Sequence, residues 1–243
     1  MRKELQHVRD VVARVGVVAS LRRAFASILW RLDTRHAAVR AVMRENAAFD
    51  RLHGTDTGGE IPLTRLGITP EAARHGNGVY RAISTSHFED ALRLFPHRHE
   101  DFVFIDYGSG KGKALLLAAA HPYRRIIGVE YAPLLHQQAR LNLRRARNLV
   151  PRQAQIDTVC ANACDYVPPD DALVCFFFNP FDAATWRVVL SRLQQQFQAN
   201  QRTILIVYLN IRDITELGDV FCEFPQFVTV ARKQTVHILM MRA

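Results

Sequence analysis

Three glycines at alternating positions follow an apolar run that ends in an acid. The stretch reads FIDYGSGKGKA, with Asp106 near the end of the run and Gly108, Gly110 and Gly112 in the turn after it. Glycine adopts positive φ without a steric penalty and lets a ligand approach the backbone closely. Because ligands of open α/β sheets bind at the carboxyl ends of the strands, this turn is a candidate binding loop.

The details of this stretch disfavour two kinds of phosphate-binding loop. A P-loop requires the spacing G-x-x-x-x-G-K-[ST], but Tyr107 and Ala114 stand at its first and last positions. A dinucleotide fingerprint requires G-x-G-x-x-G, and Lys113 stands where the third glycine belongs. The negative charge of Asp106 would also repel a pyrophosphate. The loop therefore indicates a ligand without phosphate.

An acid beside a glycine loop favours a ligand that carries positive charge. S-adenosylmethionine (SAM) has an ammonium group, a sulfonium and a ribose diol, and it has no phosphate. Asp106 can set the loop and reach the amino-acid end of this ligand. Glu130, in GVEY, lies 24 residues further on, close to the roughly 20 residues expected for an acid that binds ribose hydroxyls. These two acids predict a SAM site.

The pattern of elements around these residues is that of an α/β protein. Strands are expected over 102–107, 125–131, 156–160, 172–178 and 203–209, and helices over 86–95, 113–121, 133–148, 183–198 and 213–220. Strands that alternate with helices form a parallel sheet. Two final strands, 227–231 and 236–241, are joined by the short turn RKQT and must pair antiparallel, because a parallel crossover needs a dozen or more residues.

The segment before this alternation is different. Residues 53–78 hold many turn formers, in HGTDTGGEIPL and HGNG, and they predict a long irregular segment. Long ordered loops in compact proteins are often functional. His53 and Asp56 in this segment are candidate bases.

Three stretches together resemble a known family. IDYGSGKGKALLLAA, GVEYAPLLHQQA and FFFNPFD, in this order and spacing, resemble the class I SAM-dependent methyltransferases over roughly residues 49–241. Small bacterial members with a GSGKG loop are the most similar, and the core of the non-SET histone lysine methyltransferases is more distant. The resemblance implies SAM as the cofactor and a Rossmann-like seven-stranded sheet of order 3-2-1-4-5-7-6 with the last strand antiparallel.

The resemblance also implies the cofactor-binding residues by position. Glu130 would bind the ribose, and Tyr80, in GVYRAIS, would lie over the ligand. An acid after the third strand usually faces adenine, but Asn162 holds that place and Asp165 follows three residues later, so either could take the role. The loop on the methionine side would comprise Asp106, Gly108, Ser109, Gly110 and Gly112.

At the reactive end, the candidate catalytic residues are Asn179, Pro180 and Phe181. Related enzymes carry an N/D-P-P-Y/F motif whose oxygens accept hydrogen bonds from an amine nucleophile, and NPF is one residue short of it. N-methylation is therefore one hypothesis, and a motif that only closes the pocket floor is the other. Tyr208 and Asn210 would line the acceptor side. No metal site is expected.

The basic charge is concentrated near the N-terminus. The chain has 243 residues and a net charge of +9, and residues 1–51 hold 11 Arg or Lys against 5 Asp or Glu. Apolar residues recur there at helical spacing. We expect a basic amphipathic helical appendage over residues 1–52 and a methyltransferase domain over 53–243. The appendage could contact an anionic membrane surface or another protein.

Composition and cysteine spacing bear on location and partners. The four cysteines lack zinc spacing and predict free thiols in a reducing compartment. No secretory signal and no transmembrane run of about 20 apolar residues is visible, so we expect a cytoplasmic protein. Because aromatic residues are not interleaved with the basic segment, a protein or small-molecule acceptor is favoured over nucleic acid. A non-catalytic SAM-binding module and a basic adaptor remain alternatives, and the oligomeric state stays open.

Overall fold

The computed structural model describes residues 37–69, 78–151, 154–209, 215–233 and 236–242. The chain divides into two compact units, Met1–Arg44 and Glu45–Ala243. Residues 37–53 are helical, and the rest of the helical pattern expected over residues 4–50 lies outside the described residues. The end of this helix, residues 45–53, belongs to the second unit. The role of the basic appendage stays a prediction.

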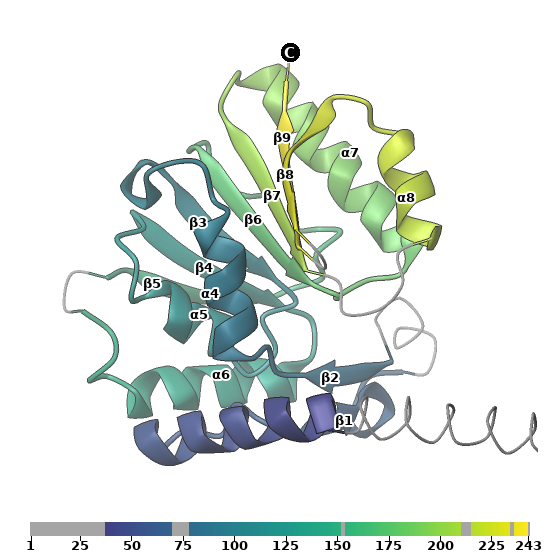
Figure 1. Ribbon diagram of the computed structural model, residues 1–243. Coiled ribbons are helices and arrows are strands. Elements are labelled where there is room, and N and C mark those ends of the chain that lie inside the picture. The colour runs from purple at the N-terminus through teal and green to yellow at the C-terminus, as the bar shows by residue number, and fades with distance from the viewer. Residues whose placement is uncertain (1–36, 70–77, 152–153, 210–214, 234–235, 243) are drawn as a thin grey trace, which may run out of the picture. The chain divides into compact units, whose positions relative to one another are not determined.

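A seven-stranded sheet forms the centre of the second unit (Figure 1). Its order is β5-β4-β3-β6-β7-β9-β8, and β9 is antiparallel to both of its neighbours while the other pairs are parallel. Counted from β3 as the first strand, this is the predicted order 3-2-1-4-5-7-6, so the predicted fold is confirmed. The strands are β3 (Val103–Tyr107), β4 (Arg125–Glu130), β5 (Ile156–Cys160), β6 (Leu173–Phe178), β7 (Ile204–Leu209), β8 (Phe227–Lys233) and β9 (Val236–Met241).

Helices cover both faces of the sheet (Figure 1). One face packs on α7 (Ala183–Ala199) and α8 (Thr215–Cys222), and the other packs on α4 (Thr85–Arg93) and α5 (Lys113–Ala118). Successive strand residues point to opposite faces. In β6, Phe177 meets Trp186 with ring centroids 4.4 Å apart, whereas Phe176 meets Phe88 on the other side at 5.3 Å. The continuous apolar runs of the central strands are therefore explained by burial on both faces.

The segment expected to be irregular contains a small hairpin. β1 (Glu60–Pro62) and β2 (Val79–Arg81) pair antiparallel, and the 3-10 turn η1 (Leu63–Arg65) follows β1 directly. The prediction of an irregular segment over residues 53–78 was wrong at β1 and η1, whereas β2 lies after that segment. Strands of three residues are too short to show a period of two, and the turn formers around them dominate the sequence pattern. Helix α6 (Pro133–Arg145) follows β4 and lies along β4 and β5.

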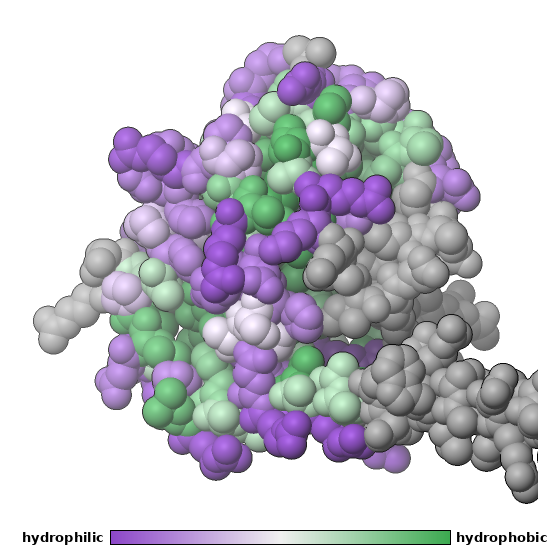
Figure 2. Space-filling model, in the orientation of Figure 1, coloured by the Kyte–Doolittle hydropathy of each residue, from purple (hydrophilic) through white to green (hydrophobic). Residues whose placement is uncertain are grey.

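One edge of the sheet is irregular. β8 pairs only with β9, and its register shifts between Thr229 and Ala231. The strand ends in the exposed residues Arg232 and Lys233, and Val228 near its start is 36% exposed. Figure 2 shows a group of hydrophobic residues over β8 and β9 on the face viewed, bordered by hydrophilic ones.

A histidine cluster beside α4 gives a prediction about stability. His99 stacks on Phe95 with ring centroids 5.1 Å apart and lies 4.9 Å from His121. Its Nε2 atom is buried and has no hydrogen-bond partner. Burial, and after it the neighbouring His121, lowers the pKa of His99 below its usual value. The folded state therefore favours the neutral ring. The contribution of His99 to the free energy of unfolding is fully present above about pH 6.5 and is lost as the pH falls below that value.

Removing this ring should make the protein less sensitive to acid. Between pH 7.5 and pH 5.5 we expect the free energy of unfolding to fall less for His99→Phe than for the wild type, as measured by urea denaturation. The exposed His97 provides the control, since His97→Gln should follow the wild-type pH dependence. Equal acid sensitivity of His99→Phe and wild type would contradict this assignment.

Candidate functional site

The glycine loop, residues 108–112, connects β3 to α5 in a conformation that other residues adopt poorly. Gly108, Gly110 and Gly112 all have positive φ, at +82°, +53° and +82°. Space is also restricted, because a Cβ atom at Gly110 would lie 2.3 Å from the Tyr80 ring and one at Gly108 would lie 2.9 Å from Pro180 Cβ. Both the backbone angles and the close neighbours explain why this loop is made of glycine.

Two buried acids lie behind and beside this loop. Asp106, on β3, is 4% exposed, and no hydrogen bond to its carboxyl is found among the described residues. Burial raises its pKa to about 8, and the charge of Glu130 adds to the shift. Glu130, at the end of β4, accepts hydrogen bonds from the backbone N–H of Gly110 at 2.7 Å and of Ala132 at 2.8 Å. Burial nevertheless raises the pKa of Glu130.

Both lysines near the loop have partners elsewhere. The Lys111 ammonium donates to Asp56 Oδ1 at 2.8 Å. The Lys113 ammonium donates to Asn46 Oδ1 and lies 4.6 Å from the Phe49 ring centroid. A phosphate-binding loop would use such a lysine on its ligand. Here both ammonium groups bind other side chains, and the Gly110 N–H of the loop binds the Glu130 carboxylate.

A cavity of about 350 Å³ opens at the carboxyl ends of the strands beside the glycine loop. Its size lies within the range of small-ligand pockets, roughly 300–1,000 Å³. Its lining is mostly apolar and includes Leu63 of η1, Ile68 after η1 and Val79 of β2. The predicted site residues that line it are Tyr80, Gly108, Glu130, Asn162, Asn179, Pro180 and Phe181.

The other predicted cofactor residues do not line the cavity. Asp106, Ser109, Gly110 and Gly112 belong to β3 or to the glycine loop and lie outside the lining. The Ser109 hydroxyl is buried without a hydrogen-bond partner. These four residues can act on a ligand through the backbone of the loop and through the field of Asp106, and their roles stay predictions.

The structure separates the two candidates for the adenine position. Asn162 lines the cavity, whereas the Asp165 side chain is 77% exposed and lies 3.9 Å from Arg192. The Asn162 Oδ1 atom already accepts a hydrogen bond from the backbone N–H of Cys164 at 2.9 Å. Asn162 therefore holds the turn after β5 in addition to facing the cavity, and its contact with adenine stays a prediction.

Asn179 follows β6 in a strained conformation. Its φ is +44°, and it is the one described residue other than glycine with positive φ. The Tyr208 hydroxyl donates to Asn179 Oδ1 at 3.2 Å. Burial raises the pKa of Tyr208, which keeps the phenol protonated and able to donate. Strained residues often occur at functional sites, where the surrounding structure holds them in place.

Several residues of this region do not have the positions that their predicted roles require. His53 packs edge-on against Phe49 at 4.6 Å and Asp56 binds Lys111, and neither lines the cavity, so they are poorly placed as bases. Asn210 lies outside the described residues. The sequence did not reveal the contacts of Lys111 and Asn142 with residues 55–58, which are separated by 50 residues or more. A buried asparagine inside an amphipathic helix was the signal that could have identified Asn142.

Metal-binding clusters and membrane-spanning helices are absent from the described residues. No cluster of three or more His, Cys, Asp or Glu side chains there could hold a metal ion. Among the helices of the described part, none combines the length and apolar character needed to cross a bilayer. Cys160, Cys164, Cys175 and Cys222 are free thiols.

Solved structures of low sequence identity are similar to part of this chain. No family model and no curated protein matches this chain. A precorrin 8w decarboxylase from Methanobacterium thermoautotrophicum is 12% identical, with 68% of this chain and 93% of that chain covered and a TM-score of 0.45. Magnesium protoporphyrin IX methyltransferase from Synechocystis, solved with bound SAM, is 12% identical, with 65% and 79% covered and a TM-score of 0.45. The N-methyltransferase NodS from Bradyrhizobium japonicum is 11% identical, with 65% and 96% covered and a TM-score of 0.46. The fold assignment rests on the strand order itself.

Proposed function

We propose that this chain binds SAM in the cavity beside the glycine loop and transfers its methyl group to a nitrogen nucleophile on a protein or a small molecule. The observation that carries the proposal is the Asp106 carboxyl. It is buried directly behind the loop, and no described cation or hydrogen-bond donor is directed at it. A buried acid without a partner is costly unless a ligand supplies the positive charge.

The residues present fit SAM. The largely apolar lining suits an adenine ring, and Glu130 at the cavity wall can accept hydrogen bonds from a ribose diol. Such charge-assisted bonds contribute on the order of 1.5–3 kcal/mol each. The charge of Asp106, acting through the glycine loop, would attract an ammonium or sulfonium and would repel the phosphates of a dinucleotide.

Asn179 and its neighbours would orient the nucleophile. SAM supplies an activated methyl group, so the task of the chain is mainly to position the acceptor nitrogen. The Asn179 side-chain oxygen can accept a hydrogen bond from an amine, and Tyr208 fixes the orientation of that side chain. Pro180 packs against Gly108, which joins this turn to the glycine loop. The turn and the loop would therefore hold the two reactants in one fixed geometry.

The binding half of this proposal can be tested without knowing the acceptor. Calorimetric titration should show saturable binding of SAM and of S-adenosylhomocysteine, and no binding of NAD. Circular dichroism of the same sample verifies that the protein is folded. Folded protein that binds neither compound, or that prefers NAD, would contradict the proposal.

The catalytic half predicts separate effects on binding and transfer. Asn179→Ala should lower the rate of methyl transfer by about 100-fold, because misplacement of a reactant by about 1 Å costs that much. Its affinity for SAM should stay near the wild-type value, because the change leaves the glycine loop and both acids intact. The rate is measured by transfer of labelled methyl groups from SAM to an acceptor found by screening. The exposed Asn148 provides a matched control, Asn148→Ala, which should behave as wild type. Unchanged transfer by Asn179→Ala would show that the turn only closes the pocket floor.

A further inference from the structure

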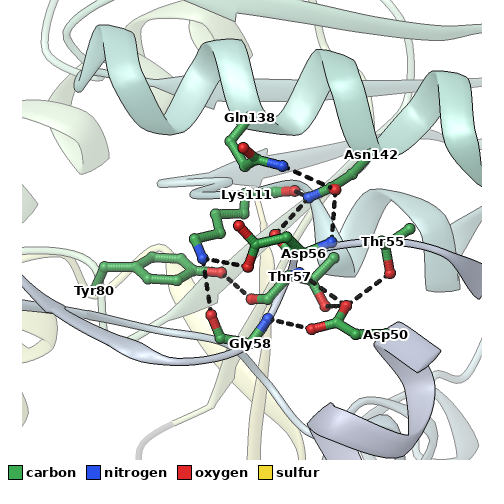
Figure 3. Close-up of polar contacts among 9 residues, drawn as sticks. All are labelled: Asp50, Thr55, Asp56, Thr57, Gly58, Tyr80, Lys111, Gln138 and Asn142. Carbon is green, nitrogen blue, oxygen red and sulfur yellow. Dashed lines mark hydrogen bonds and ion pairs between the residues drawn. The ribbon is translucent and has the colours of Figure 1, made fainter.

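A turn outside the cavity is held by one carboxylate. The Asp50 turn, residues 54–58, connects helix 37–53 to β1 and wraps around the side chain of Asp50 (Figure 3). Asp50 Oδ1 accepts hydrogen bonds from the hydroxyls of Thr55 and Thr57, at 2.6 and 2.7 Å, and from the Thr57 N–H at 2.8 Å, while Oδ2 accepts from Gly58 N–H at 2.8 Å. Burial alone would raise the pKa of Asp50, but these hydrogen bonds outweigh it and lower the pKa. Asp50 is therefore ionised at neutral pH, and its carboxylate can hold the turn through these four hydrogen bonds.

Three side chains join the Asp50 turn to the glycine loop and its surroundings (Figure 3). Lys111 donates to Asp56 Oδ1 at 2.8 Å and to the Gly58 carbonyl at 3.0 Å, and its side chain is 8% exposed. Asn142, fully buried on α6, donates to the carbonyls of Asp56 and Lys111 at 2.8 and 2.9 Å and accepts from the Asp56 N–H at 2.9 Å. The Tyr80 hydroxyl donates to the Thr57 carbonyl at 2.6 Å. The turn thus contacts the loop through both its side chain and its backbone.

These contacts involve the part of the loop whose backbone conformation is unfavourable for most residues. Lys111 stands between Gly110 and Gly112, which both have positive φ. The Tyr80 ring lies directly over Gly110 and also lines the cavity. Lys111, Asn142 and the Asp50 turn do not line the cavity. Any effect of these residues on a ligand must therefore pass through the glycine loop or through Tyr80.

We propose that Lys111 is a positioning residue, which ties the glycine loop to the Asp50 turn and thereby sets the affinity for SAM without touching it. The inference rests on the proposed function for its ligand. An ammonium that is almost fully buried and pairs with a carboxylate loses much of its stabilisation when the partner is removed. The loop backbone at Lys111 would then keep its contacts with Asn142 and Tyr80 but lose the link to the Asp50 turn, and the backbone N–H of Gly110 would be fixed less firmly toward Glu130.

Two lysines of the chain allow a matched test. Lys111→Met should weaken SAM binding about tenfold, within the range of 5- to 150-fold typical for energetic coupling between distinct sites. Lys113→Met removes an equally buried ammonium two residues away that binds Asn46 instead, so it should lower thermal stability but leave the affinity for SAM within about twofold of wild type. Asp56→Ala, at an exposed carboxylate, should reproduce the effect of Lys111→Met if that variant does not fold. The double variant should bind SAM no more weakly than the weaker single variant, because Lys111→Met already removes the ion pair with Asp56.

Hydrogen exchange gives a readout that needs no ligand. Backbone amides of residues 108–112 should exchange faster in Lys111→Met and in Asp56→Ala than in wild type, and should be unchanged in Lys113→Met. If the wild type fails to bind SAM, the proposed function is wrong, and the exchange rates still decide whether Lys111 holds the loop. If the wild type binds SAM and Lys111→Met binds it equally well, or Lys113→Met loses as much affinity, the positioning role of Lys111 is overturned.

Discussion

Gly110→Ala is expected to weaken the binding of SAM by about 100-fold while the protein remains folded. Alanine at φ +53° costs about 1–2 kcal/mol in backbone strain. Its Cβ atom would also lie 2.3 Å from the Tyr80 ring, so the ring or the loop must move. Overpacking of this kind adds roughly 1–3 kcal/mol. Since Tyr80 lines the cavity and Gly110 N–H binds Glu130, the movement would distort two walls of the site. A loss of about 100-fold corresponds to roughly 2.8 kcal/mol.

The control separates strain from crowding. Gly67 has a similar φ of +71°, is exposed, and would place a Cβ atom with nothing within 4 Å. Gly67→Ala should therefore lose about 1–2 kcal/mol of stability and bind SAM as the wild type does. Both variants are compared by calorimetric titration and thermal denaturation. Equal affinities of Gly110→Ala and Gly67→Ala would show that contact with Tyr80 does not shape the site.

Asp106→Asn should change stability and binding in opposite directions. The pKa of Asp106 is raised from 3.8 to about 8, first by burial and second by the charge of Glu130. The folded state therefore binds a proton that the unfolded state releases, and this contribution to stability is present below about pH 4 and is lost as the pH rises through about 8. As the pH rises, the free energy of unfolding falls by at most about 1.4 kcal/mol per pH unit because of this group. Asparagine resembles the protonated acid and does not ionise, so the variant should be more stable than wild type at pH 8.

The same substitution should remove most of the affinity for SAM, since it takes away the charge that we propose attracts the cationic end of the ligand. For the wild type, affinity should rise between pH 6 and pH 8, because binding to the charged carboxylate releases a proton. Asp157→Asn is the control, because Asp157 is an exposed acid paired with Arg125. Its free energy of unfolding should change by at most about 1 kcal/mol. Thermal denaturation and calorimetry at three pH values measure both effects. A variant that is less stable at pH 8, or that binds SAM as tightly as wild type, would contradict this account of Asp106.

The sequence predicted the sheet well because its signals are local. Continuous apolar runs such as FVFIDY and ALVCFFF mark strands that are buried on both faces, and the four-residue turn RKQT leaves only an antiparallel pairing for the last two strands. The sequence also identified the three glycines and the two acids of the site, because each lies at or just after the end of a predicted strand. The Asp50 turn could not be predicted in this way. Lys111 and Asp56 are 55 residues apart, and only the fold shows that the ammonium binds Asp56 and does not line the cavity.

The hairpin β1–β2 illustrates the same limit. Each of its strands has three residues, and the segment that joins them is rich in turn formers, so no period of two is visible. Its place beside the cavity depends on contacts of Leu63 and Tyr80 with residues elsewhere in the chain. Sequence reasoning therefore identified the glycine loop, its two acids and Tyr80, and missed the Asp50 turn and Asn142, which contact the loop from elsewhere in the chain.

The irregular edge of the sheet has a consequence for how copies of this protein behave at high concentration. An exposed edge strand presents unpaired N–H and C=O groups that can recruit a strand from another molecule. The register shift between Thr229 and Ala231 interrupts the regular spacing of these groups along β8, and Arg232 and Lys233 place two positive charges at its end. Two such edges would repel each other and would not match in register. The edge therefore discourages self-association into extended sheets, even though hydrophobic residues lie beside it.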